Sequence, residues 1–123
     1  MRRRLDPGQD HPISIESKRS PVRILLAGET VLTAASHLEL REASYPAAIY
    51  LPRQDLDLSR LKRSDHSTWC PYKGEARYFH VRHPDGTWVE NAVWTYETPF
   101  AAVAEIKDAL AVYTSKVDAV EIG

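Results

Sequence analysis

Cysteine is nearly absent from this sequence: Cys70 is the only one among 123 residues. A single thiol cannot close an intramolecular disulfide, which agrees with a reducing compartment. The chain also has no C-x-x-C or H-E-x-x-H spacing, no P-loop and no G-x-G-x-x-G. These absences exclude the commonest metal-binding and phosphate-binding motifs, and we expect no cofactor.

Neither sign of charge dominates, with 16 basic against 17 acidic residues and a formal net charge of -1. Because a nucleic-acid binder normally carries a basic stripe, we expect no nucleic-acid partner. The longest weakly charged stretches, 45–52 and 98–104, contain prolines and fall short of the roughly 20 residues of a membrane span. Since Met1-Arg2-Arg3-Arg4 is followed by polar residues, we expect no export signal and no membrane partner, but a soluble, cytoplasmic protein.

The apolar residues that are present follow strand-like alternation in most of the chain. Residues 1–12, rich in charge, Pro and Gly, are expected to form a flexible N-terminal arm, and residues 13–123 a single domain. Residues 22–34 predict a hairpin that turns at Ala27-Gly28. Further strands are expected at 37–42, at 47–52 and after residue 109.

The segment 76–96 predicts another hairpin, because two alternating runs flank Asp85-Gly86, a dipeptide suited to a type I′ turn. With these two residues at the centre of the turn, the strand register follows. The expected opposite pairs are Phe79 with Ala92, Arg77 with Trp94, and His80 with Asn91.

Two segments predict helical structure. Thr98-Pro99 offers an N-cap and a first-turn proline, and Phe100, Val103 and Ile106 recur at helical spacing. We therefore expect one substantial α-helix at about 99–107. A short helical turn is expected between Asp55 and Leu61, with Asp55 or Asp57 as its N-cap. The fold class is mainly β with this one helix.

Three longer segments carry a family resemblance: "DHSTWCPYKGEARYF", "ENAVWTYETPFAAVAEIKDALAVY" and "LREASYPAAIYLPRQDL". From about His11 onward the chain resembles the small bacterial family known as domain of unknown function 427, which is also given a nucleotidyltransferase-like label. The resemblance implies a β-tent (Mss4-like) fold, in which two antiparallel sheets lean together. Relatives with the tent fold usually hold a structural zinc through paired cysteines, which a chain with one cysteine cannot reproduce.

Aromatic and charged residues on the 76–96 hairpin and its neighbours predict a small-molecule pocket. In the expected register, Arg77, Trp94 and Tyr96 share one face with Glu90, and the guanidinium can lie over the indole. Aromatic walls with a few charged groups are typical of sites for polar or anionic ligands. The alternative is that these aromatics only fill a core. The predicted pocket residues are Tyr72, Lys73, Arg77, Trp94, Tyr96, Arg41, Glu42 and Tyr50, and Tyr45 and Arg53 could join them.

An enzyme that uses the same pocket is the alternative hypothesis. Cys70 is a nucleophile only if its thiol is activated, for which Lys73, His66 and Asp65 are close in sequence. Partners crowded into one short segment seldom reach triad geometry, so we favour Cys70-Pro71 as a turn. The candidate catalytic residues are His66, Cys70 and Glu90.

Three further hypotheses stay open at this point. A metal site would draw on His66, Cys70, His80, His83 or Glu90, but none of their spacings supports it, and we predict no metal. Nucleotidyl transfer would need paired carboxylates such as Asp55 and Asp57, which we interpret as helix caps. A non-catalytic interaction module, including a homo-oligomer paired through edge strands, is the third.

Overall fold

Two antiparallel sheets make up the protein, for which a computed structural model describes residues 3–123. The larger sheet has the strand order β1 (Ile13–Lys18), β4 (His37–Glu42), β5 (Ala48–Leu51), β9 (Leu110–Val112), β8 (Trp88–Thr95), β7 (Gly74–Arg82) and β6 (Leu61–Cys70). The smaller sheet has the order β10 (Ala119–Ile122), β2 (Val22–Leu26) and β3 (Glu29–Ala34). Within residues 3–123, four short 3₁₀ segments lie in the connections between strands: η1 (Arg53–Asp55), η2 (Leu58–Arg60), η3 (Ala101–Ile106) and η4 (Thr114–Lys116). The mainly β fold class is confirmed.

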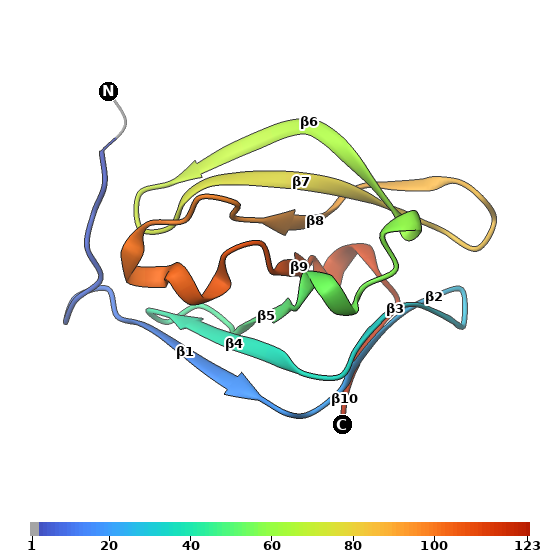
Figure 1. Ribbon diagram of the computed structural model, residues 1–123, viewed down its shortest axis with the longest axis horizontal. Coiled ribbons are helices and arrows are strands. Elements are labelled where there is room, and N and C mark those ends of the chain that lie inside the picture. The colour runs from blue at the N-terminus through green and yellow to red at the C-terminus, as the bar shows by residue number, and fades with distance from the viewer. Residues whose placement is uncertain (1–2) are drawn as a thin grey trace.

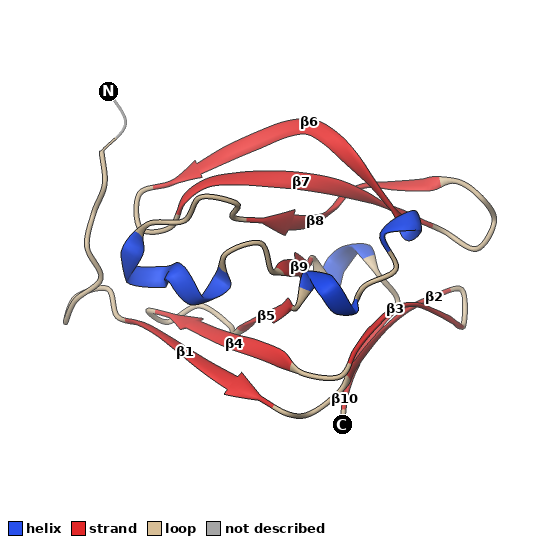
Figure 2. Cartoon of the chain, in the orientation of Figure 1, coloured by secondary structure: helices blue, strands red, loops and turns tan. Residues whose placement is uncertain are grey.

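The larger sheet bends, so that β6, β7 and β8 form one layer and β1 and β4 the opposite one, with η3 between them (Figure 1). Its two faces bury different cores. One face contributes Leu51, Val93 and Leu110 to an apolar cluster shared with β2 and β3 of the smaller sheet. The other, concave face carries Tyr50 and Tyr78 in a second cluster, covered by η3. Figure 2 shows how little of the chain is helical.

Several predicted elements are confirmed. β2 and β3 form the expected hairpin, and its turn residues Ala27 and Gly28 both have positive φ, 51° and 76°. β4, β5, β9 and β10 lie where strands were expected. The side chain of Asp57 caps η2 by accepting a hydrogen bond from the backbone N–H of Ser59 (3.0 Å).

The 76–96 hairpin exists, but its predicted register is wrong. The turn has three residues, Pro84 to Gly86, closed by a hydrogen bond from His83 N–H to Thr87 O (2.8 Å). A bulge then shifts the pairing between Phe79 and Val81. The predicted pairs Phe79–Ala92, Arg77–Trp94 and His80–Asn91 are replaced by Phe79–Val93, Arg77–Thr95 and Tyr78–Trp94.

The predicted α-helix at 99–107 is also wrong, because the structure has the six-residue 3₁₀ segment η3 there. Val103 has φ −127° and ψ 32°, which interrupts the helical backbone. The physical reason is the spacing of the two buried residues. Val103 and Ile106 are three positions apart, and three residues per turn is the period of a 3₁₀ helix.

The described part of the N-terminal arm contacts the folded domain. Leu5 N–H donates to Pro71 O (2.8 Å), and the ring of His11 stacks on that of Tyr72 with centroids 3.8 Å apart. Met1 and Arg2, which belong to the predicted arm, lie outside the described residues. Within residues 3–123, none of the helical segments has the length and apolar character that a membrane crossing requires.

Candidate functional site

The concave face of the larger sheet contains a cavity of about 300 Å³. Its walls come from β4 and β5 on one side, from β6, β7 and β8 on the other, and from the loop 43–47. We call this cavity the tyrosine chamber. Its lining residues are Leu40, Glu42, Tyr45, Pro46, Ala48, Tyr50, Thr68, Lys73, Tyr78, Trp94, Tyr96 and Tyr113.

A buried ion pair joins Lys73 and Glu42 in the chamber wall. Their side chains are only 10% and 14% exposed. Glu42 also contacts His11, with 2.7 Å between Nε2 and Oε2. Burial alone would raise the pKa of Glu42, but the hydrogen bonds with Lys73 and His11 lower it below its usual range. The carboxylate therefore stays charged at neutral pH and compensates the ammonium.

Local backbone structure holds Lys73 in this position. Residues 71–73 form the turn between β6 and β7, as the sequence Cys70-Pro71 predicts. Gly74 follows with φ +108°, and a Cβ there would lie 3.4 Å from Thr98 O. Phe100 N–H donates to Lys73 O (3.0 Å). The 98–100 segment thus packs against the turn and fixes the start of the lysine side chain.

Hydroxyl groups form a row along the chamber. The Tyr78 hydroxyl lies 2.9 Å from Thr68 Oγ1 and 3.3 Å from the Tyr113 hydroxyl. Trp94 Nε1–H donates to the Tyr50 hydroxyl (3.1 Å). Burial raises the pKa of Tyr50 and of Tyr113, so these phenols stay protonated at neutral pH. They offer hydrogen bonds to a ligand and do not act as phenolate bases.

The chamber gathers five of the eight predicted pocket residues: Glu42, Tyr50, Lys73, Trp94 and Tyr96. Burial raises the pKa of Tyr96, whose ring lies 6.0 Å from the Lys73 ammonium. Tyr72 does not line the cavity but stacks on His11 next to Glu42. Arg41 lies outside it as an exposed side chain paired with Glu39.

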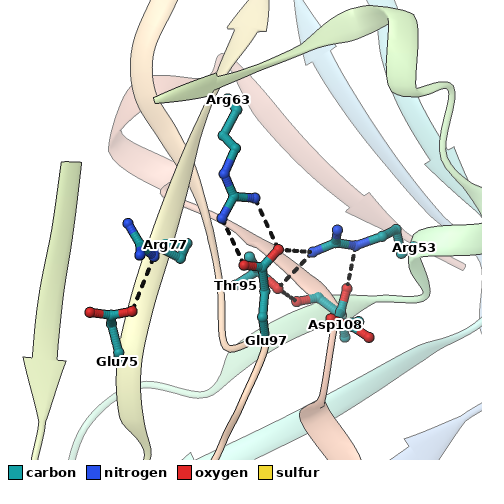
Figure 3. A network of polar contacts seen from close by, with 8 residues as sticks. Arg53, Arg63, Glu75, Arg77, Thr95, Glu97 and Asp108 are labelled. Atoms are coloured by element: carbon teal, nitrogen blue, oxygen red, sulfur yellow. Dashed lines mark hydrogen bonds and ion pairs between the residues drawn. The ribbon is translucent and has the colours of Figure 1, made fainter. Parts of the chain in front are cut away.

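The predicted contact of Arg77 with Trp94 is wrong, because the two side chains lie on opposite faces of the sheet. Arg77 pairs with Glu75 at 3.1 Å (Figure 3). Its face carries a different polar cluster, in which Arg63 contacts both carboxylate oxygens of Glu97 (2.7 and 3.0 Å). Arg53 approaches the same carboxylate at 3.6 Å.

The charged side chains of that cluster on the opposite face pair with one another. Hydrogen bonds from Arg63 lower the pKa of Glu97, and the charges of Arg53 and Arg77 add to this effect. Arg53 also donates to Asp108 O (2.9 Å) and to Thr95 Oγ1 (3.3 Å) (Figure 3). The guanidinium groups are therefore engaged in linking β8 to neighbouring segments, and we assign them a structural role.

The three candidate catalytic residues do not come together. His66 and Cys70 both lie in β6, where four residues of extended strand separate Cα atoms by about 13 Å. The His66 ring lies against Tyr78, with centroids 4.5 Å apart. Cys70 packs on the concave-face core, and Glu90 is exposed, with its carbonyl accepting from Lys116 Nζ (2.9 Å). Within residues 3–123, no three His, Cys, Asp or Glu side chains gather as metal ligands.

Sequence reasoning missed three chamber residues with hydroxyl groups: Thr68, Tyr78 and Tyr113. Tyr78 was missed because the predicted register faced Arg77, and not Tyr78, toward Trp94. Thr68 was missed because β6 was not predicted; its sequence is polar, and a register shift between Arg63 and Ser67 breaks the alternation. Tyr113 directly follows β9 and lies in the segment that was predicted to form the closing strands. Its position in the chamber could therefore have been inferred from the sequence.

The Lys73–Glu42 ion pair predicts how the stability of the protein depends on pH. Because the pKa of Glu42 is lower folded than unfolded, the pair contributes stability that is fully present above the unfolded pKa of about 4.3 and is lost as pH falls. Urea unfolding of the wild type and of Lys73→Met/Glu42→Leu over a pH series isolates this contribution. We expect the unfolding free energies of the two proteins to differ by a constant amount near neutral pH. Below about pH 4, the wild type should lose stability relative to the double variant. A difference independent of pH would contradict the assignment.

Comparison with protein families identifies the chain. Residues 14–123 match the family NTP_transf_9, described as a domain of unknown function (DUF427). Comparison with curated proteins found no match. The resemblance predicted from the sequence is confirmed, and the chain belongs to the DUF427 family.

Proposed function

We propose that this DUF427 protein binds a small, uncharged polar molecule in the tyrosine chamber. The observation that carries the proposal is the combination, in one cavity, of a row of hydroxyl groups with a buried lysine that is paired with a carboxylate. Aromatic walls with a few convergent polar groups are the usual composition of ligand sites, and about 300 Å³ lies at the lower end of their size range.

The charged groups of the chamber indicate the charge of the ligand that it can bind. A polar or anionic ligand was expected from the sequence, with Lys73 and Arg77 in contact with its negative part. Arg77 lies on the other face, and Lys73 is paired with Glu42. A bound anion would meet the Glu42 carboxylate next to the ammonium, which already pairs with it. The arrangement therefore favours a ligand with hydroxyl, amide or carbonyl groups over one with a phosphate or carboxylate.

Binding is better supported than catalysis. The candidate nucleophile Cys70 has no imidazole within reach on its strand, and the phenols of Tyr50 and Tyr113 are protonated because burial raises their pKa. Asp55 and Asp57, the carboxylates considered for nucleotidyl transfer, accept hydrogen bonds from Ala35 N–H (3.1 Å) and Ser59 N–H (3.0 Å). The nucleotidyltransferase-like label of the family thus gains no support from these carboxylates.

Calorimetric titration with benzamide and benzoate tests the proposal. Benzamide presents an uncharged polar group on a planar ring, and benzoate is its anionic counterpart. Ala48 lines the chamber, so Ala48→Phe is expected to weaken benzamide binding about tenfold or more, the equivalent of about 1.4 kcal/mol. Ala102→Phe, the same change at an exposed position, is the control and should bind like the wild type. Equal binding by both variants, or tighter binding of benzoate, would contradict the proposal.

We also propose that residues 13–123 form one β-tent (Mss4-like) domain, with the N-terminal segment as a flexible arm. Two antiparallel sheets that share an apolar core support the architecture. A cytoplasmic location, the absence of nucleic-acid and membrane partners, and self-association stay predictions. For self-association, β1 and β6 are the edge strands of the larger sheet, and edge strands can pair with a strand of another chain.

A further inference from the structure

A second and larger cavity lies next to the tyrosine chamber, between the two sheets. Its volume is about 440 Å³. Aliphatic side chains line most of it: Ile24, Ile49, Leu51, Val112 and Val120. Among the described residues, 3–123, no charged side chain lines this apolar cavity. Its size and its walls suit a hydrocarbon group of a small molecule.

The two cavities have a common wall, made by Tyr45, Pro46, Ala48, Trp94 and Tyr113. The rings of Trp94 and Tyr113 pack together with centroids 4.4 Å apart. Tyr45 and Pro46 of the loop 43–47 line both cavities, so a molecule that passes over this loop can reach the aliphatic side chains of one cavity and the hydroxyl groups of the other.

The polar groups at the common wall already have hydrogen-bond partners. These partners are uncharged or belong to an ion pair. The Trp94 indole N–H is bonded to Tyr50, and the Tyr113 hydroxyl lies beside that of Tyr78. Across residues 3–123, no buried side-chain nitrogen or oxygen lacks a hydrogen-bond partner. A charged head group would lose its hydration here without finding an unpaired opposite charge, and burying such a charge costs far more than burying an uncharged polar group.

We infer that the ligand is a neutral amphiphile, with an uncharged polar head in the tyrosine chamber and a hydrocarbon chain in the apolar cavity. This inference rests on the proposed function for the head group and adds the second cavity as the site that recognises the chain. Tyr45 is 66% exposed and lines both cavities, so the loop 43–47 stands at the solvent side of the common wall, where a ligand can enter.

Calorimetry with hexanamide and octanamide tests the role of the apolar cavity. Each additional buried methylene should tighten binding about fourfold, so octanamide is expected to bind about 15-fold more tightly than hexanamide. Val120, in β10 of the smaller sheet, lines the apolar cavity but not the chamber. Val120→Phe should therefore remove this chain-length dependence while leaving benzamide affinity unchanged, and Ala102→Phe should retain both.

The outcomes separate the inference from the proposed function. If hexanamide and octanamide bind equally while benzamide still binds, the apolar cavity takes no chain and the inference fails, but the proposed function stands. If octanoate binds more tightly than octanamide, the ligand is not neutral and the inference also fails. If benzamide and both aliphatic amides fail to bind the folded wild type, the proposed function fails as well.

Discussion

Replacing Lys73 by methionine is expected to lower the free energy of unfolding by about 3–5 kcal/mol. The substitution keeps the length of the apolar stem but leaves the Glu42 carboxylate, 14% exposed, without its ammonium partner. An uncompensated buried charge is costly because neither water nor another charge stabilises it. The remaining contact with His11 places the expected loss toward the lower end of this range. Urea unfolding at neutral pH measures it.

The double variant Lys73→Met/Glu42→Leu is the matched control for this prediction. It removes both charges and keeps the volume apolar, and replacement of a buried ion pair in this way is often neutral or stabilising. We expect it to unfold within about 1 kcal/mol of the wild type. If the single variant is as stable as the wild type, the ion pair is not buried in solution as the structure has it.

Replacing Ile24 by alanine is expected to cost about 2–5 kcal/mol of unfolding free energy. Ile24 lies in β2 and is 1% exposed, in the apolar cluster between the two sheets. Truncating it removes contacts with the larger sheet and leaves a void that the neighbouring side chains fill only in part. Thermal or urea unfolding measures the loss.

Ile122→Ala provides the comparison for Ile24→Ala within the same small sheet. Ile122 lies in β10 opposite Val22 and is 50% exposed, so its truncation should change stability by less than about 0.5 kcal/mol. Equal losses at both positions would mean that the apolar interface does not hold the smaller sheet in place.

Local sequence signals predicted strands better than they predicted how strands pair. Gly28 required a turn with positive φ, and the hairpin 22–34 formed around it. The Asp85-Gly86 signal found the second hairpin, but Asp85 alone does not fix whether its turn has two or three residues. Asn91, with φ +52°, lies beside the bulge in β8 that completes the shift. Such bulges depend on tertiary contacts that single-sequence patterns do not contain.

The candidate site was also predicted only in part, because local sequence signals do not contain strand register or tertiary contacts. Lys73, Glu42 and the aromatic residues Tyr50, Trp94 and Tyr96 were identified by residue type, which is local information. Their separation from Arg77 was not predicted, because it follows from the register. Nor was the pairing of Lys73 with Glu42, which joins residues 31 positions apart in sequence. That pairing narrows the expected ligand from a polar or anionic molecule to an uncharged polar one.

The most direct test of the central claim is the indole N–H signal of Trp94 in ¹⁵N–¹H correlation spectra during titration with benzamide. Trp94 lines the tyrosine chamber, whereas Trp88 lies on the far part of the hairpin near Lys62 and Arg82. We expect the Trp94 signal to move to saturation while the Trp88 signal stays in place. A Trp94 signal that does not move at saturating benzamide, or that moves no more than that of Trp88, would contradict it.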